Sequence, residues 1–309
     1  MKKKPFAILG VTVCALMLGA CGSGAGTKGS STQVVAAFYP FAFVAAEVGG
    51  TNVAVDNLTS PGVEPHDLEL KPKQVGSVQN ADLVLFEKHF QAAVDEAVDQ
   101  AGRNDKDTVD VAELVRLQPL PAGTDEDGAD EKHGHDEDDP HVWLDPVNMI
   151  AVTEAVRAKL SAIDPDHAAS YDKNAAALTA KLKDLDKSFS AGLARCQTSK
   201  IVTSHAAFGY LAKRYGLEQV AIAGIDPSNE PSPAQLADIT KLVRKNKITT
   251  IFTEELVSPA IASTVAQETG AKTATLDPIE GLSDETADEN YLTLMAKNLA
   301  VIEKANNCS

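Results

Sequence analysis

The sequence has few of the residues that build thiolate metal sites or nucleic-acid interfaces. Only four of its 309 residues are cysteine, and none lies at zinc-finger spacing from a second cysteine or a histidine. Positive charge is also scarce, because 28 Lys and Arg face 44 Asp and Glu and give a net charge of −16. This excess of acid disfavours nucleic acid and anionic lipid as partners, and it is compatible with cation binding.

Long apolar runs are missing after the first 20 residues. The N-terminal run Phe6–Leu18 follows three lysines and has 13 residues, fewer than the roughly 20 that cross a bilayer. This pattern predicts a secretory signal over residues 1–20. The signal ends in a small-small-Cys order at Cys21, which resembles a bacterial lipobox and predicts lipidation there; the alternative is an ordinary signal with a chance cysteine. The small, polar residues 21–32 predict a flexible tether.

Two cysteines remain for the folded protein. Cys14 leaves with the signal and Cys21 is the predicted lipid site, so Cys196 and Cys308 form an even pair in an exported chain. A disulfide between them is the default expectation.

Short β-rich runs alternate with helical stretches in both halves of the mature chain, which predicts two α/β lobes with mostly parallel sheets. Asp145-Pro146 and Asp164-Pro165 each provide an N-cap followed by proline at a first helical turn. From Ala168 to Leu193, apolar residues recur at steps of three and four, which indicates one long amphipathic helix. The expected organisation is an N-terminal lobe over residues 33–145, a helical spine over residues 146–198 and a C-terminal lobe over residues 199–309.

The segment Thr124–Asp139 breaks the alternation. It has nine acidic residues together with His133 and His135, and it lacks the apolar side chains of a core. We expect a disordered loop in this stretch. It is either a solvated linker or a second, weaker metal site formed by its two histidines and its carboxylates.

Histidine and carboxylate residues lie at four points where strands end or a helix begins. His66 follows the second predicted strand, His141 precedes the helix at Asp145, and His205 follows the first strand of the second half. Two carboxylates, Asp277 and Glu280, follow the last strand. Because ligands of open α/β sheets collect at the carboxyl ends of strands, these side chains are expected to meet in a cleft between the lobes. Three imidazoles and one carboxylate suit tetrahedral Zn²⁺.

The segments that carry these residues resemble the metal-specific solute-binding proteins of ABC importers in the ZnuA/AdcA/TroA cluster. The matching stretches are Gly62-Val63-Glu64-Pro65-His66-Asp67, Pro140-His141-Val142-Trp143-Leu144-Asp145-Pro146, Thr203-Ser204-His205-Ala206-Ala207-Phe208 and Pro278-Ile279-Glu280-Gly281-Leu282. The resemblance implies that His66, His141, His205 and Glu280 bind the metal, with Asp277 or a water as rivals for the fourth position. A histidine at position 205, where manganese members commonly have a carboxylate, favours Zn²⁺ over Mn²⁺.

The resemblance also implies the function. It predicts a lipid-anchored, extracytoplasmic receptor that delivers Zn²⁺ to an ABC permease and its ATPase, acts as a monomer and catalyses nothing. The alternatives are a manganese-specific member of the same cluster, a zinc-binding surface adhesin and a zinc buffer without a transporter. A zinc hydrolase is disfavoured, because the sequence has no His-Glu-x-x-His motif.

Overall fold

The structure, a computed structural model, describes residues 31–120 and 138–309. The predicted lipid site Cys21 and the loop histidines His133 and His135 lie outside the described residues. Within the described ranges, no helix is both long enough and apolar enough to cross a membrane.

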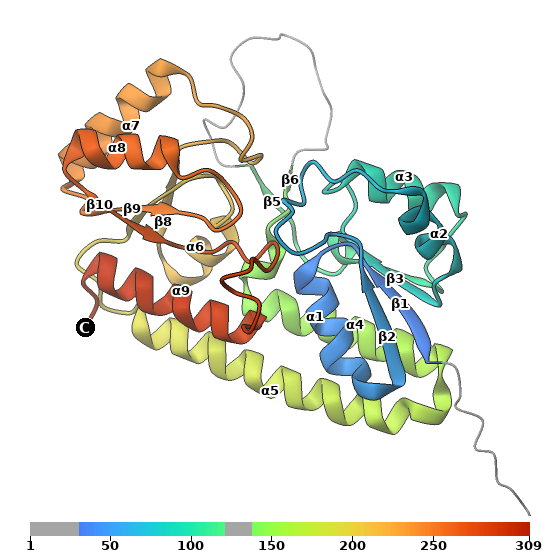
Figure 1. Cartoon of the computed structure of the whole chain (residues 1–309). Helices are drawn as coiled ribbons and strands as arrows, with labels where there is room; N and C mark the ends of the chain where they lie inside the picture. Colours follow the sequence, from blue (N-terminus) through green and yellow to red (C-terminus); the bar gives the residue numbers. More distant parts are fainter. Residues whose placement is uncertain (1–30, 121–137) are drawn as a thin grey trace, which may run out of the picture. The chain divides into compact units, whose positions relative to one another are not determined.

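Two four-stranded parallel sheets form the two predicted lobes (Figure 1). The N-terminal sheet has the order β2-β1-β3-β4 and the C-terminal sheet the order β10-β9-β7-β8, so both lobes place their second and third strands on either side of the first. The strands of the N-terminal lobe are β1 (Thr32–Ala36), β2 (Val53–Asn57), β3 (Leu83–Phe86) and β4 (Thr108–Asp110). Those of the C-terminal lobe are β7 (Lys200–Thr203), β8 (Glu218–Ala221), β9 (Thr250–Thr253) and β10 (Lys272–Thr275).

Helices connect the parallel strands in both lobes. The N-terminal lobe contains α1 (Tyr39–Gly49), α2 (Pro72–Asn80) and α3 (Ala92–Gln100). The C-terminal lobe contains α6 (Gly209–Tyr215), α7 (Pro233–Asn246), α8 (Ala260–Thr269) and α9 (Tyr291–Asn306). In Figure 1, α7 and α8 lie on one side of the C-terminal sheet, and α6 and α9 lie on the other. Short 3-10 turns occur at Gly50–Asn52, Val111–Glu113, Val142–Leu144 and Pro165–His167.

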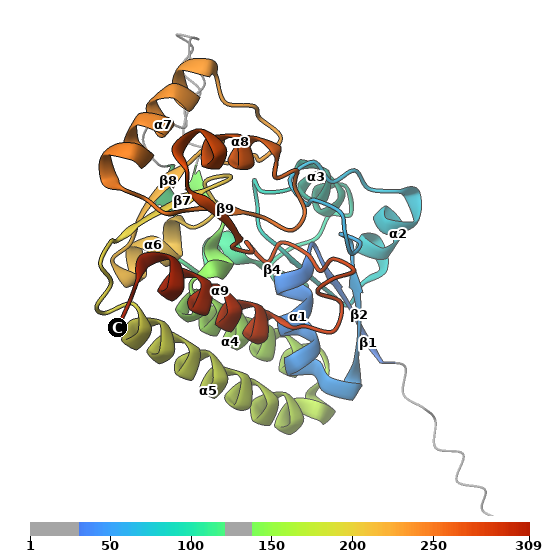
Figure 2. The ribbon, with the colours of Figure 1, turned by 60° about the vertical axis from the view of Figure 1, so that its left-hand side comes forward.

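The predicted spine consists of two helices, α4 (Pro146–Ile163) and α5 (Ala168–Gly192), which pack against each other. Asp145 caps α4 through a bond from the Val147 N–H to its Oδ1, and Pro146 occupies the first turn, as the sequence predicts. The 25 residues of α5 give a rod of about 37 Å at 1.5 Å per residue. Figure 2 shows α1 of one lobe and α9 of the other along this pair of helices, and both contact α5.

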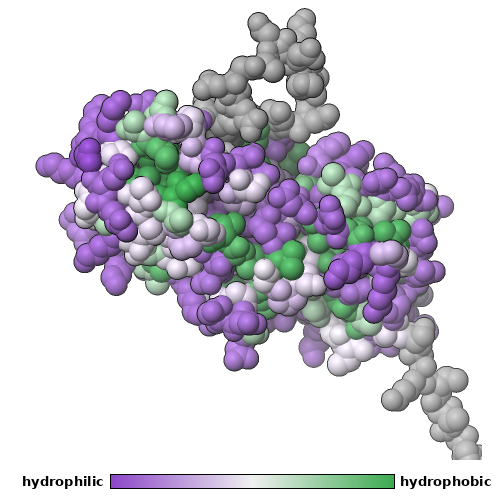
Figure 3. Space-filling view, turned by 45° about the horizontal axis from the view of Figure 1, so that its top comes forward, coloured by the Kyte–Doolittle hydropathy of each residue, from purple (hydrophilic) through white to green (hydrophobic). Residues whose placement is uncertain are grey.

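The main hydrophobic core is continuous from the N-terminal lobe through the spine into the C-terminal lobe. It includes the buried stripe of α5 and the inner residues of α1 and α9, while a smaller cluster fills the space between the C-terminal sheet and α7 and α8. Figure 3 shows apolar residues scattered among polar ones on the face in view. A shared core fixes the position of one lobe relative to the spine and hence the relative position of the segments that each lobe carries.

The prediction of a disordered loop over Thr124–Asp139 is wrong for the last two residues of that range. Asp138–Asp139 forms β6, which pairs antiparallel with β5 (Gln118–Pro119), and Asp139 is 1% exposed. Composition alone did not predict this strand, because nothing in an acidic run distinguishes an aspartate that is buried from one that is solvated.

The expected disulfide is confirmed. Cys196 and Cys308 are bonded across 112 residues of sequence and join the end of α5 to the end of α9.

Candidate metal centre

Four side chains from four segments converge between the lobes, and each presents one donor atom to the same small space. They are His66, His141, His205 and Glu280, and their donor atoms all lie within 4.8 Å of one another. The N-terminal half supplies the first two and the C-terminal half the other two. His141 and His205 are fully buried, and Glu280 is 1% exposed.

The spacing of the donor atoms matches a tetrahedral site. Glu280 Oε1 lies 3.5 Å from the Nε2 atoms of His66 and His141 and 3.3 Å from Nε2 of His205. The Nε2 atoms of His141 and His205 are 3.3 Å apart. Tetrahedral Zn²⁺ with bonds of about 2.0–2.1 Å separates its ligand atoms by about 3.3–3.4 Å. These four distances therefore fit a zinc ion, and the donor atoms of His66 and the other two histidines lie within 4.8 Å of one another.

Loops at the carboxyl ends of strands position three of the four donors. His205 lies two residues after β7 and Glu280 five residues after β10. His66 is in the loop after β2, and a bond from the Gly62 N–H to the Leu282 carbonyl, 2.7 Å long, joins this loop to the one that carries Glu280. The loops of the two lobes therefore contact each other beside the donor atoms.

The turn before Glu280 is strained. Ile279 is β-branched and fully buried, yet its φ is +58°, a region that such residues rarely adopt. Asp277 Oδ1 accepts a 2.7 Å bond from the Ile279 N–H and supports this turn. Asp277 is thus placed under the turn, and it is not among the four convergent donors.

Two buried carboxylates bond to the histidines on the side away from the donor atoms. Asp139 Oδ1 accepts from the backbone N–H of His141 at 3.0 Å and lies 2.8 Å from its Nδ1. Glu254 accepts from the backbone N–H of His205 at 3.0 Å and lies 2.7 Å from its Nδ1. Both rings thus present Nε2 to the shared space. Sequence reasoning missed these two carboxylates, although Glu254 directly follows a buried strand, a position that marks ligand sites in such sheets.

His66 is fixed differently. Its backbone N–H donates to both carboxylate oxygens of Glu64, at 3.1 and 3.0 Å, but this carboxylate is 4.0 Å from its Nε2. Burial, together with the nearby charge of Glu280, raises the pKa of Glu64 to about 7.

The electrostatics of the cluster follow from burial and from the carboxylates. Burial lowers the pKa of His66. Burial also opposes protonation of His141 and His205, but the bonds and charges of Asp139, Glu254 and Glu280 outweigh it and raise both pKa values. Burial disfavours the Glu280 anion, yet the nearby imidazoles of His141, His205 and His66 hold its pKa well below the usual range. These shifts favour a proton on His141 and His205, and a negative charge on Glu280, in the metal-free protein.

Aromatic rings close the site on the N-terminal side. The ring centroids of His66 and Phe90 are 4.8 Å apart, and those of His141 and Trp143 are 5.1 Å apart. Trp143, the single tryptophan of the sequence, is fully buried, and its Nε1–H donates to the Pro278 carbonyl at 2.7 Å. It thus connects the two lobes next to the donor atoms.

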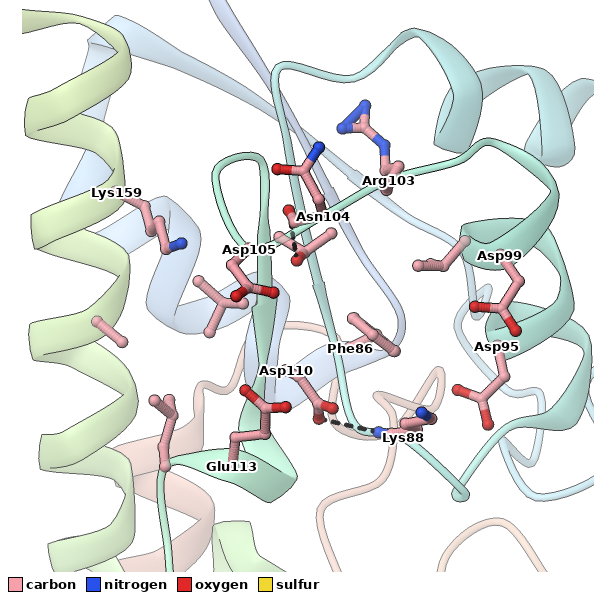
Figure 4. A pocket seen from close by; sticks show the side chains of 15 residues that line it. Phe86, Lys88, Asp95, Asp99, Arg103, Asn104, Asp105, Asp110, Glu113 and Lys159 are labelled. Atoms are coloured by element: carbon pink, nitrogen blue, oxygen red, sulfur yellow. Dashed lines mark hydrogen bonds between the residues drawn. The ribbon is translucent and has the colours of Figure 1, made fainter.

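A separate surface pocket of about 260 Å³ lies between α4 and the end of β3 and β4 (Figure 4). Its acidic side chains, among them Asp95, Asp105 and Asp110, lie beside Lys88 and Lys159. None of the four convergent donors lines it, and its mixed charges do not indicate a metal site.

Comparison with known proteins gives one consistent result. The family model for ZnuA, the periplasmic zinc-uptake complex component A, matches residues 34–305. The chain is 40% identical over 311 residues to the zinc-binding lipoprotein AdcA of Streptococcus pneumoniae R6, covering 98% of this chain and 61% of AdcA. It is 35% identical over 320 residues to the high-affinity zinc uptake system protein ZnuA of Bacillus subtilis 168, covering 98% of both chains.

Solved structures agree with this result. The Zn(II)-bound ZnuA-like domain of Streptococcus pneumoniae AdcA is similar with a TM-score of 0.75 and 38% identity, covering 90% of this chain and 99% of that domain. The chain spans only about three fifths of the length of the whole pneumococcal AdcA.

Proposed function

The chain belongs to the ZnuA family of zinc-uptake components, and from this premise we propose that it is an extracytoplasmic receptor that captures Zn²⁺ and delivers it to an ABC importer. The ion is the cargo. His66, His141, His205 and Glu280 are its four ligands in this proposal.

One observation carries the proposal: buried donor atoms face one another without hydrogen-bond partners. Both carboxylate oxygens of Glu280 and Nε2 of His66 are buried and unpaired. A buried polar atom without a partner costs about 1–3 kcal/mol, so such a group of atoms needs a ligand to explain it. A cation at the centre would bind Nε2 of His66 and one carboxylate oxygen of Glu280, together with one nitrogen each of His141 and His205.

The ligand set supports zinc rather than manganese. Three imidazole nitrogens and one oxygen are softer than the carboxylate-rich sets that suit Mn²⁺, and affinity rises from Mn²⁺ to Zn²⁺ for a given set of ligands. With neutral imidazoles and ionised Glu280, a bound Zn²⁺ leaves one positive charge, and the carboxylates of Asp139 and Glu254 lie near enough to offset it. The imidazoles must be neutral to bind the ion, so zinc binding should release the protons that they hold in the metal-free protein.

The arrangement supports a receptor rather than an enzyme. A catalytic zinc site keeps a position for water, whereas four side-chain ligands complete a tetrahedral shell. The name of the relative AdcA, a zinc-binding lipoprotein, supports attachment through Cys21. The proposal further includes an ABC permease and its ATPase as partners and a monomer as the working form.

Two measurements test the proposal. Purified protein should hold one Zn²⁺ per chain, determined by elemental analysis, and should retain it in competition with Mn²⁺. His205→Glu should then shift preference towards Mn²⁺, because it replaces a nitrogen ligand with a harder oxygen. Preference for Mn²⁺ in the unmodified protein would overturn the zinc assignment, and unchanged selectivity in the variant would remove His205 from the ligand set.

A further inference from the structure

We infer that Asp139 is a positioning residue for the metal ligand His141. The pairing of β5 with β6 and the close approach of Gly209 keep Asp139 in its position. This inference rests on the proposed function, since it concerns how the proposed zinc site is kept in a binding geometry. It assigns a role to residues at the end of the acidic segment, which composition alone marks as solvated.

Asp139 fixes His141 at two points. Its Oδ1 accepts from the backbone N–H and from the ring Nδ1–H of the same residue, so both the position of the main chain and the rotation of the ring are set. A hydrogen on Nδ1 leaves Nε2 with its lone pair towards the other donors. Metal-binding histidines are generally oriented in this way, and loss of the orienting group typically lowers metal affinity by about 10- to 100-fold.

Tyr210 holds the main chain of Asp139. The Tyr210 hydroxyl donates to the Asp139 carbonyl at 2.8 Å and accepts from the Gln118 N–H at 2.9 Å, so it joins β5 and β6 to helix α6 of the other lobe. The pairing of Gln118 with Asp139 adds the strand contact. The carboxylate therefore approaches His141 from a backbone that is fixed by both lobes.

Gly209 provides the space that the carboxylate needs. A Cβ atom at this position would lie less than 3.0 Å from Asp139 Oδ2, a separation that real Cβ contacts essentially never show. Gly209 has no positive φ, so close approach rather than backbone conformation explains the glycine. Asp139 is 1% exposed and cannot move away into solvent without breaking its bonds to His141.

The test compares zinc affinity and the state of the His141 ring in four variants of the full chain. Asp138→Asn is the matched control, because Asp138 is the exposed neighbour of Asp139 in β6. Asp139→Asn keeps an oxygen acceptor without the charge, Asp139→Ala removes it, and Gly209→Ala displaces it. Zinc affinity is measured by chelator competition. Nitrogen NMR of the metal-free protein, at a pH high enough for a neutral His141 ring, reports which ring nitrogen of His141 carries the proton.

We expect about 10- to 100-fold weaker zinc binding for Asp139→Ala and Gly209→Ala, a smaller loss for Asp139→Asn and no change for Asp138→Asn. The Nδ1–H tautomer of His141 should remain the main form in Asp139→Asn. It should no longer be the main form in Asp139→Ala. Thermal unfolding identifies a variant that does not fold, in which case Asp139→Asn decides. Equal affinity of the Asp139 variants and the control, or an unchanged His141 ring in Asp139→Ala, would overturn the inference. Failure of the unmodified protein to bind one zinc would instead overturn the proposed function.

Discussion

At the scale of the residue, the buried carboxyl groups differ in whether a partner offsets the cost of burying them. Glu280, Asp139 and Glu254 contact histidines, whereas Glu87 is 3% exposed and its Oε2 has no hydrogen-bond partner. Burial raises the pKa of Glu87 well above its usual range, and the negative charges of Asp139 and Asp110 raise it further. Glu87 directly follows β3, as Glu254 directly follows β9, so the third strand of each lobe ends in a buried acid.

The first prediction concerns Glu87→Gln and pH. Since the folded-state pKa is above the unfolded value of about 4.3, the folded state holds the proton more tightly. The stability that this proton contributes is complete below the unfolded pKa and is lost as pH rises towards the folded pKa. Glutamine should abolish this loss and stabilise the metal-free protein at pH 8 by on the order of 1–3 kcal/mol, with little difference near pH 4.

Urea unfolding across this pH range measures the effect of Glu87→Gln. Glu113→Gln, which changes an exposed acid of the same lobe, is the control and should leave the pH dependence unchanged. A variant that loses stability equally at every pH would show that folding does not raise the pKa of Glu87.

The sequence predicted the four convergent donors but not the groups behind them. The four segments could be selected because each lies at a strand end or a helix start, and the family resemblance then selected His66, His141, His205 and Glu280 within them. Asp139 and Glu254 could not be selected in the same way, because their partners are defined by the packing of chain segments that are far apart in sequence. The strained φ of Ile279 is also a tertiary property, since the core and Asp277 impose it against the preference of the residue.

At the scale of the element, the alternation of β-rich runs with helical stretches predicted two α/β lobes, and Asp145-Pro146 predicted the start of α4. Local signals suffice there because β1, β3, β7 and β9 are mostly buried, and because proline marks the start of a helix. The β5–β6 pair was missed. Two-residue strands have no periodicity, and this pair is stabilised by Tyr210 from a distant helix.

The second prediction concerns the acidic segment. Replacing residues 121–137 with about four Gly and Ser residues should leave zinc affinity and stability unchanged, because β5, β6 and Asp139 remain. A replacement that extends through Asp139 should weaken zinc binding by about 10- to 100-fold, since it removes the partner of His141. Chelator competition measures the zinc affinity of both proteins. Equal affinities would contradict the prediction, because they would mean that Asp139 is as dispensable as residues 121–137.

At the scale of the whole molecule, α5 supports both lobes, and the disulfide joins its end to α9. The third prediction is that changing Cys196 and Cys308 to Ser lowers the melting temperature of the metal-free protein. The bond closes a loop of 112 residues, for which chain entropy gives about 4 to 5 kcal/mol, or about 10 °C in a chain of this size.

Zinc stoichiometry should stay at one in this double variant, because neither cysteine contributes a donor to the cluster. Thiol titration of the unfolded, unreduced protein provides the control and should find no free thiol from this pair. A drop in zinc content with an unchanged melting temperature would mean that the cysteines bind metal instead of each other.

The measurement that tests the central claim most directly is anomalous diffraction at the zinc edge from crystals of the zinc-loaded protein. We predict one strong peak between the lobes, bonded to Nε2 of His66, His141 and His205 and to a carboxylate oxygen of Glu280 at about 2.0–2.1 Å. A principal peak elsewhere in the protein, or one whose fourth ligand is Asp277 or water in place of Glu280, would contradict the account.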